Sequence, residues 1–246
     1  MIAGGSVKVP AARVGSQGIA GRRGVSVRAR ASAVRAAVER PPKVVLDELP
    51  IVYAYDHCPY CVRVRLGLGL KNVKHEVVFM ANDDVKKPTG LIGKKIAPIF
   101  EIPDEKLIMG ESMDIVKKID AEEKYGSTGF FAGATDRKDI KAWMKSPEWK
   151  AEEFGQEARE EAYAAAMAKT PELLPELNAA LVELEKLIYS DSSCSEVGLG
   201  LDDIDLWSRL RSVTLVEGAE FQPKTLAYLN NLSEAGDVPL YFGMKC

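Results

Sequence analysis

Residues 55–61 read YDHCPYC, and this stretch decides how the rest of the chain is interpreted. It joins an apolar run, residues 50–55, to a segment with the composition of a helix. Pro59 suits the first turn of that helix, where its missing N–H costs nothing. Cys58 is then the residue that caps the helix, where free backbone N–H groups and the helix dipole stabilise a thiolate. We therefore expect the pKa of Cys58 to fall from about 8.5 into the range of about 3.5–7.5.

The spacing of the two cysteines predicts different roles for them. Cys58 is the predicted nucleophile of a thiol redox reaction. Cys61 lies three residues further on, about one helical turn away and in a more buried position. From there it is placed to attack a mixed disulfide formed at Cys58, so Cys61 is the predicted resolving thiol.

Two other interpretations of this cysteine pair are disfavoured. A zinc site needs about four ligands, usually from a second cysteine pair or a pair of histidines. The other cysteines, Cys194 and Cys246, stand alone in the sequence. The only histidines are His57 and His75, so we expect no metal ion. A structural disulfide within the pair would close too short a loop to constrain the unfolded chain much.

The composition excludes several classes of protein. The chain has 246 residues, 46% hydrophobic and 28% charged, with a formal charge of −3, as is typical of folded globular proteins. No run of about 18 apolar residues occurs, so the sequence predicts no transmembrane helix and no membrane partner. The slightly acidic balance, without a basic stripe in the folded part, argues against nucleic acid as a partner.

The first 40 residues have the composition of a disordered transit peptide. Residues 1–38 contain no Asp or Glu but seven Lys or Arg, and they lack the apolar core of a secretory signal. The tripeptides at 27–29 and 34–36 resemble the Val-x-Ala processing sites of plastid leaders. We expect a chloroplast or plastid stroma protein. A mitochondrial leader, or a disordered tail on a cytosolic protein, remains an alternative.

The order of elements over residues 50–125 is that of an α/β thioredoxin-like domain. The pattern predicts a strand, a helix, a second strand, a helix start, a hairpin and a closing helix. These expected elements are Ile51–Tyr55, Pro59–Leu70, His75–Met80, residues 82–84, Pro98–Glu101 with Lys106–Met109, and Ser112–Glu123.

Residues 126–135 are rich in Gly, Ser and Thr and are predicted to be a linker, and residues 136–246 a helical C-terminal domain. Leucine and isoleucine recur from Leu177 to Ile188 at the spacing of a single apolar helix face. Apolar residues between Ile204 and Val213 cover too broad an arc for a surface helix, so this segment is the predicted central buried helix.

These patterns together resemble a known family. The resemblance is carried by YDHCPYC at 55–61, GLKN at 69–72, NDD at 82–84, PT at 88–89, AP at 97–98, ESMDIV at 111–116, DDI at 202–204 and LRSVTLV at 210–216. These stretches closely resemble the glutaredoxin 2 family, the two-domain glutaredoxins built like glutathione transferases. The resemblance covers about residues 50–240. It implies an α/β thioredoxin-like N-terminal domain packed on an all-α C-terminal domain.

One departure from the family is visible at Gly200, where the family places Ser or Thr to cap the central C-terminal helix. Glycine is an acceptable N-cap that costs only about a few tenths of a kcal/mol relative to Ser. We therefore expect a slight loss of stability and no loss of function.

The resemblance also implies glutathione as the cosubstrate. At the helix opened by Glu111 and Ser112, the hydroxyl of Ser112 and free N–H groups could hold the γ-glutamyl carboxylate, and Glu111 could accept from the ammonium. The alternative for Ser112 is an ordinary helix cap. Lys95 is the candidate for the glycyl carboxylate, with a solvated surface lysine as the alternative.

The resemblance further implies a cis peptide bond between Ala97 and Pro98, which would expose the Ala97 backbone to pair with the cysteinyl part of glutathione. Tyr60 is expected to shape the groove, with simple packing as its alternative. Arg63 and Arg65 are expected to be exposed helix residues that add positive charge to this side of the molecule.

The expected activity is that of a dithiol glutaredoxin, a glutathione-dependent thiol–disulfide oxidoreductase. Its expected partners are glutathione, glutathionylated or disulfide-containing proteins and, indirectly, the glutathione reductase system. Two alternatives stay open. A glutathione transferase shares the architecture, although the intact cysteine pair argues against it. A glutathione-ligated iron–sulfur carrier is disfavoured because Pro59 and Tyr60 stiffen and crowd the site.

Overall fold

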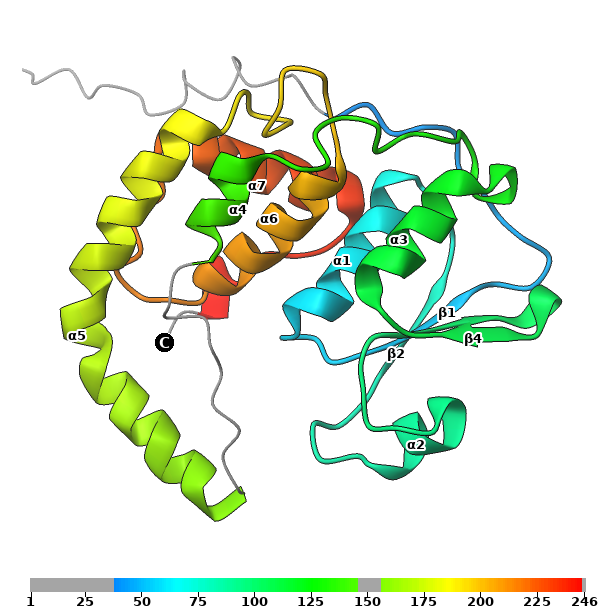
Figure 1. Ribbon diagram of the computed structural model, residues 1–246, viewed down its shortest axis with the longest axis horizontal. Coiled ribbons are helices and arrows are strands. Elements are labelled where there is room, and N and C mark those ends of the chain that lie inside the picture. Colours follow the sequence, from blue (N-terminus) through cyan, green and yellow to red (C-terminus); the bar gives the residue numbers. More distant parts are fainter. Residues whose placement is uncertain (1–37, 146–155, 245–246) are drawn as a thin grey trace, which may run out of the picture. The chain divides into compact units, whose positions relative to one another are not determined.

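The structure is a computed structural model that describes residues 38–145 and 156–244. Nearly all of the expected transit peptide therefore lies outside the described residues. Residues 36–246 form one compact unit, in which the two expected domains pack together (Figure 1). Arg40, which the sequence analysis assigned to the leader, donates a hydrogen bond to Asn72 Oδ1 at 2.9 Å.

A four-stranded mixed sheet forms the centre of the first domain. Its strands lie in the order β2-β1-β3-β4, where β1 pairs with β2 in parallel and with β3 antiparallel, and β3 pairs antiparallel with β4. The strands are β1 Ile51–Ala54, β2 Glu76–Phe79, β3 Ile99–Ile102 and β4 Leu107–Met109. Strands β1, β2 and β4 lie within their predicted ranges, and β3 ends one residue later than predicted, at Ile102, so the order of elements confirms the thioredoxin-like arrangement.

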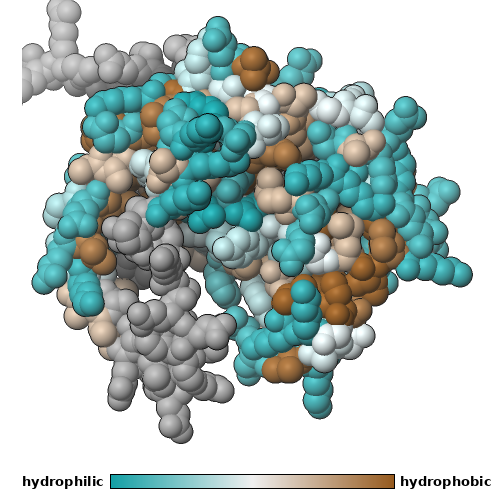
Figure 2. All heavy atoms as spheres, in the orientation of Figure 1, coloured by the Kyte–Doolittle hydropathy of each residue, from teal (hydrophilic) through white to brown (hydrophobic). Residues whose placement is uncertain are grey.

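Helices cover the two faces of this sheet unequally. The helices of the domain are α1 Pro59–Leu70, α2 Lys86–Ile92 and α3 Ser112–Ala121. Short 3₁₀ turns follow β3 at Pro103–Glu105 and α3 at Glu123–Tyr125. One face of the sheet packs on α1 and α3 through a buried apolar cluster that includes Val52, Leu68 and Ile115. The other face contacts α2, and several of its apolar side chains are only half-buried. Figure 2 shows the resulting hydrophobic area over the sheet near α2.

The predicted helix start at residues 82–84 is displaced by a few residues. Helix α2 begins at Lys86, and the carboxylate of Asp84 accepts a hydrogen bond from the Lys87 N–H at 3.0 Å. The acidic residues therefore lie before the helix, where they still favour its positive end.

The second domain consists of helices, as expected. They are α4 Lys138–Trp143, α5 Gln156–Leu187, α6 Leu201–Val213 and α7 Pro223–Gly236, with a 3₁₀ turn at Phe242–Met244. Helix α6 lies at the centre, and its apolar residues from Ile204 to Val213 are buried, which confirms the prediction for this segment. The apolar face of α5 also lies in the core through Leu181 and Leu184.

Helix α1 lies between the sheet and the helical domain and is buried from Cys61 to Leu70. One side of α1 packs on the sheet, whereas Val62, Leu66 and Leu70 join the apolar core of the helical domain. Gly69 permits this contact, because a Cβ atom there would lie 1.8 Å from the carbonyl oxygen of Gly236 in α7. The glycines near the end of α1 thus reflect close helix packing, and the helix continues through them to Leu70.

Gly200 is required by its surroundings. It caps α6, and its N–H donates to the Asp203 carboxylate at 2.8 Å. A Cβ atom at this position would lie 2.1 Å from the carbonyl oxygen of Ala134, in the segment predicted to be a linker. The expected loss of stability from a glycine cap is therefore wrong for this backbone, because Ser or Thr would have no room here.

Candidate active site

The end of β1 delivers Cys58 to the start of α1 through a tight turn. The Cys58 N–H donates to the carbonyl oxygen of Tyr55 at 3.2 Å, and the Cys58 carbonyl accepts the first helical hydrogen bond, from Val62, at 3.0 Å. Cys58 is the N-cap residue with an extended backbone, and Pro59 is the first helical residue. Both residues have the places that the sequence predicts.

The environment of Cys58 favours its thiolate. Hydrogen bonding from the Cys61 thiol lowers the pKa of Cys58 to about 7, and it outweighs the burial that would raise it. The backbone N–H groups of Cys61 and Tyr60 and the charge of Arg63 act in the same direction. The Cys58 sulfur does not accept a capping hydrogen bond that meets the usual distance and angle limits. These N–H groups therefore act on the sulfur at longer range. At neutral pH a large fraction of Cys58 is therefore the nucleophilic form.

The second cysteine has the opposite properties. Cys61 is completely buried, whereas Cys58 is half-buried. Its sulfur accepts a hydrogen bond from the Tyr55 N–H at 3.4 Å. The neighbouring Cys58 and burial raise the pKa of Cys61, so Cys58 ionises first. The difference agrees with the predicted roles of nucleophile and resolving thiol.

Arg63 is buried, which corrects the expectation that it is an exposed helix residue. Its side chain is inserted between the domains, where it donates to Ser112 Oγ at 3.2 Å and pairs with Asp205 of α6. Its guanidinium carbon lies 4.6 Å from the centroid of the Tyr60 ring, which is 49% exposed. Arg63 thus connects the cysteine motif with α3 and with the helical domain.

Glu111 and Ser112 lie at the start of α3, but the N-cap side chain makes no capping hydrogen bond. Glu111 is the N-cap residue, exposed and with a positive φ of 65°, and Ser112 is the first helical residue. Ser112 is buried, and its hydroxyl oxygen accepts from Arg63. The hydroxyl proton is therefore directed away from Arg63 and remains available for an acceptor.

The Ala97–Pro98 bond is cis, as the resemblance implied. The structure places the loop around Pro98 beside the residue that precedes Glu111, because a Cβ atom on Gly110 would lie 3.9 Å from the Pro98 carbonyl oxygen. Ala97 and Cys58 both pack against the apolar cluster between the sheet and α1. The cysteine motif, the cis-proline loop and the start of α3 therefore share one end of the domain.

Within the described residues, no polar contact connects the side chain of Lys95 with the other proposed site residues. Lys95 is exposed, and among the described residues no hydrogen bond or ion pair joins its side chain to Tyr60, Ala97 or Ser112. A metal site is not formed either, since the described part of the chain contains no group of three or more His, Cys, Asp or Glu side chains placed to hold an ion. None of the described helices is long and apolar enough to cross a membrane.

Comparison with known proteins decides the family. Residues 153–244 match the family model described as "Glutaredoxin 2, C terminal domain". Residues 52–127 match the family model described as "Glutathione S-transferase, N-terminal domain". The chain is 30% identical over 218 residues to Glutaredoxin 2 of Escherichia coli strain K12, a match that covers 78% of this chain and 98% of that protein. The chain belongs to the glutaredoxin 2 family.

Solved structures agree with this membership. Glutaredoxin 2 from Salmonella typhimurium, solved in complex with glutathione, has a TM-score of 0.71 at 29% identity and covers 81% of this chain and 100% of its own. FzlA from C. crescentus has a TM-score of 0.57 at 15% identity, covering 80% and 96%. Glutathione transferase Omega 3C from Trametes versicolor has a TM-score of 0.51 at 16% identity, covering 79% and 86%. The last two share the fold alone.

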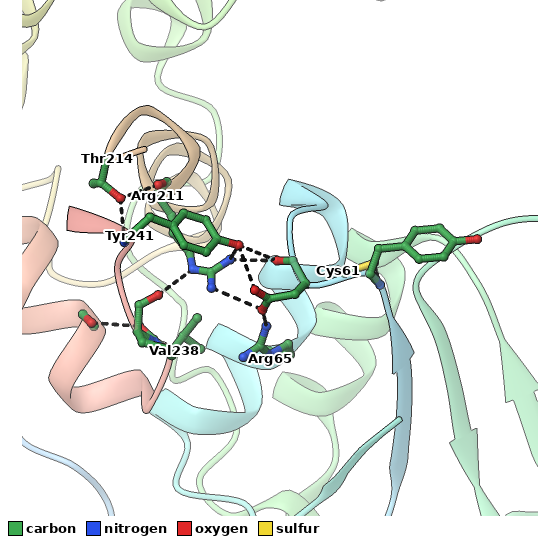
Figure 3. Close-up of polar contacts among 10 residues, drawn as sticks. Cys61, Arg65, Arg211, Thr214, Val238 and Tyr241 are labelled. Atoms are coloured by element: carbon green, nitrogen blue, oxygen red, sulfur yellow. Dashed lines mark hydrogen bonds and ion pairs between the residues drawn. The ribbon is translucent and has the colours of Figure 1, made fainter. Parts of the chain in front are cut away.

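In this member of the glutaredoxin 2 family Arg65 is buried as well, which corrects the expectation that it is an exposed helix residue. Arg65 is 8% exposed and pairs with Asp56 at 2.7 Å, and Arg211 of α6 reaches the same carboxylate at 3.3 Å (Figure 3). A signal was present, because arginines that alternate with valine in an otherwise apolar helix must be paired if that helix is buried. The partner Arg211 could not be inferred, because it lies 155 residues from Asp56 in the sequence.

Proposed function

We propose that this protein is a glutathione-dependent dithiol glutaredoxin that reduces glutathione mixed disulfides and protein disulfides. The observation that carries the proposal is the pairing of a half-buried Cys58 of lowered pKa with a buried Cys61 of raised pKa at the start of α1. Family membership supports it, as does the glutathione complex of the Salmonella relative.

The reaction begins at the Cys58 thiolate. It attacks the glutathione sulfur of a glutathionylated protein, which forms a Cys58–glutathione disulfide and releases the protein thiolate, which then takes up a proton. A second glutathione thiolate then attacks the glutathione sulfur of that disulfide, forming glutathione disulfide and regenerating Cys58. When the substrate is a protein disulfide, two glutathione molecules supply the two electrons that reduce it. The glutathione reductase system is proposed to supply reduced glutathione.

Cys61 offers a second route for resolution. With a protein disulfide as substrate, Cys58 forms a mixed disulfide with the protein. The Cys61 thiolate then attacks the Cys58 sulfur, which forms the Cys58–Cys61 disulfide and releases the dithiol protein. Two glutathione molecules then reduce the Cys58–Cys61 disulfide and leave as glutathione disulfide. The neighbouring Cys58 contributes to the raised pKa of Cys61, so ionisation of Cys61 becomes easier once the Cys58 charge is lost on forming the mixed disulfide.

Glutathione is proposed to lie between the cysteine motif, the cis-proline loop and the start of α3. Ser112 is proposed to donate its hydroxyl proton to the γ-glutamyl carboxylate, since Arg63 occupies the acceptor side of that hydroxyl. Glu111, which is exposed, is proposed to accept from the ammonium group. The Ala97 backbone would pair with the cysteinyl part, Tyr60 would border the groove, and Lys95 would bind the glycyl carboxylate.

A coupled assay tests the proposal. The full chain, with glutathione, glutathione reductase and hydroxyethyl disulfide, is expected to oxidise NADPH, and the Cys58→Ser variant is expected to be inactive. Conjugation of chlorodinitrobenzene in place of disulfide reduction would instead make the protein a glutathione transferase.

We also propose that the N-terminal transit peptide directs the protein to the plastid stroma and is cleaved off on import. Support comes from the acid-free, basic composition of the segment and its two Val-x-Ala tripeptides. The mature protein is expected to begin between Ala29 and Ala37. N-terminal sequencing of the protein from isolated plastids tests this, and an intact Met1 there would contradict it.

A further inference from the structure

The turn that precedes Cys58 is held from the helical domain, by residues to which the proposed reaction assigns no role. Asp56 and His57 lie at the centre of this turn, between Tyr55 and Cys58. Both the backbone carbonyl and the carboxylate of Asp56 accept hydrogen bonds from the C-terminal part of the chain (Figure 3).

Two side chains supply these hydrogen bonds. Arg211, in α6, donates through Nη1 to the Asp56 carbonyl oxygen at 2.8 Å and through Nη2 to Asp56 Oδ1 at 3.3 Å. The hydroxyl of Tyr241 lies 2.9 Å from the same carbonyl oxygen and 3.1 Å from Asp56 Oδ2. Every oxygen of Asp56 is thus within reach of the helical domain.

The two donors are themselves fixed. Arg211 is 1% exposed and donates through Nε to the Pro239 carbonyl at 2.7 Å and through Nη1 to Tyr241 Oη at 2.6 Å. Because the Tyr241 oxygen accepts from Arg211, its single proton is directed to Asp56. The Tyr241 backbone N–H donates to Thr214 Oγ1 at 3.0 Å, which anchors the C-terminal segment on the end of α6.

Charge reinforces this arrangement. The Asp56 carboxylate lies between two guanidinium groups, because Arg65 of α1 donates to Asp56 Oδ1 at 2.7 Å from the other side. Burial alone would raise the pKa of Asp56, but the two arginines and Tyr241 lower it, so Asp56 stays ionised at neutral pH. The turn is therefore attached at once to α1 and to the helical domain.

We propose that Arg211 and Tyr241 are positioning residues for the redox reaction, which act by clamping Asp56 and thereby holding Cys58 at the N-terminus of α1. The clamp keeps the Cys58 sulfur close to the N–H groups of the first helical turn and to the Cys61 thiol. When the clamp is weakened, the turn samples other conformations in which the thiolate lacks these donors. The reactivity of Cys58 then falls while the residues proposed to bind glutathione stay in place.

The test measures, in the reduced full chain, the rate at which iodoacetamide alkylates Cys58 as a function of pH. Mass spectrometry follows the alkylation. The Tyr241→Phe variant removes one hydroxyl and keeps the ring. Losing this hydrogen bond is expected to raise the pKa of Cys58 by about 0.5 to 1 pH unit and to slow alkylation about 3- to 10-fold below pH 7. The control is Tyr125→Phe, which removes a buried hydroxyl for which the described residues show no hydrogen bond to Asp56 or to either cysteine of the motif, and it is expected to leave the pKa of Cys58 unchanged.

A second variant keeps the test decisive if Tyr241→Phe does not fold. Arg211→Lys retains the positive charge but loses the fork that binds several acceptors, so the same rise in the pKa of Cys58 is expected. In the hydroxyethyl disulfide assay both variants should lower kcat and leave KM for glutathione unchanged. If a folded variant has the same pKa of Cys58 as the unmodified chain, the proposal is overturned, even if its melting temperature is lower. Arg211 and Tyr241 would then only hold the two domains together.

The proposal takes its reaction from the proposed function, but its primary readout does not depend on it. Alkylation reports on Cys58 alone, so the clamp can be supported or overturned even in a protein that fails to reduce disulfides.

Discussion

Burial separates the two thiols of the site. Cys58 borders solvent beside donors that favour its charge, whereas Cys61 is enclosed and faces the charge of its neighbour. In the proposed reaction, one thiol attacks at neutral pH and the other becomes reactive only after the first has formed a disulfide. The proposed division of roles follows from placement, because the two residues are chemically identical.

The pH dependence of Cys58 should report its contact with Cys61. The alkylation rate of Cys58 should rise with pH and level off above its pKa of about 7, because only the thiolate reacts. Cys61→Ala removes the hydrogen bond that contributes most to this lowering, so the curve should move to higher pH. Cys61→Ser keeps a donor and should move it less. A curve that is the same in all three proteins would show that Cys61 does not stabilise the thiolate.

Glutathione binding should depend on Ser112 and Glu111. Ser112→Ala and Glu111→Ala each remove one proposed contact with a charged group of glutathione, worth roughly 1.5–3 kcal/mol. Each change should therefore raise KM for glutathione about tenfold or more, as measured in the coupled disulfide assay. An unchanged KM in both variants would remove the two residues from the proposed site. Glu183→Gln, at a surface pair whose side chains are 64% and 63% exposed, is the control.

At the scale of elements, helix α1 links the sheet, the cysteine motif and the helical domain. The sequence predicted both ends of α1, because Pro59 marks its start and Lys71-Asn72 a turn. It did not predict that Arg63 and Arg65 are buried, since burial depends on α6 and α7, which lie over 130 residues away in the chain. Local sequence patterns predict the helix itself, whereas the residues that pack around it are determined by the tertiary structure.

The close contact between α1 and α7 should make Gly69 sensitive to substitution. In Gly69→Ala the new methyl group would meet the Gly236 carbonyl, so the helices must separate, at a cost of about 3 kcal/mol or more. Gly90→Ala, in α2, adds its methyl group in open space and should stabilise the protein by about 0.5–1 kcal/mol through helix propensity. Urea unfolding of both variants measures this, and equal stabilities would contradict the packing of α1 on α7.

The pairing of Arg63 with Asp205 should support both stability and glutathione use. Asp205→Asn leaves the buried guanidinium without its charged partner, which should cost about 1–3 kcal/mol in urea unfolding. Since Arg63 also holds Ser112 and lies over Tyr60, KM for glutathione should rise in the same variant. Glu183→Gln again serves as the control, with an expected change below about 1 kcal/mol. A variant as stable as the control would show that Asp205 does not hold Arg63.

At the scale of the whole molecule, the proposed site lies where the two domains meet. The thioredoxin-like domain supplies the cysteines, the cis-proline loop and the start of α3. The helical domain supplies Asp205, Arg211 and Tyr241, which hold Arg63 and the turn before Cys58. The geometry of the site thus depends on the packing of both domains on α1.

This division also explains how much could be predicted from the sequence. The strand and helix order, the central position of α6 and the cis bond were predicted, because local patterns or the family resemblance carry them. Gly200 was misinterpreted, because the approach of Ala134 cannot be inferred from residues 66 positions away. The hydrogen bond that Ser112 accepts was not predicted either, because its donor Arg63 was expected to be exposed.

In the proposed reaction Cys58 is the nucleophile of a glutathione-dependent disulfide reductase and Cys61 is its resolving thiol. Turnover of a glutathionylated peptide and of a protein with an intramolecular disulfide by Cys58→Ser and Cys61→Ser tests it most directly. Cys58→Ser should be inactive on both substrates. Cys61→Ser should still remove glutathione, because a second glutathione replaces it, but should reduce the protein disulfide poorly. Equal loss of deglutathionylation in both variants, or full activity of Cys58→Ser, would contradict the account.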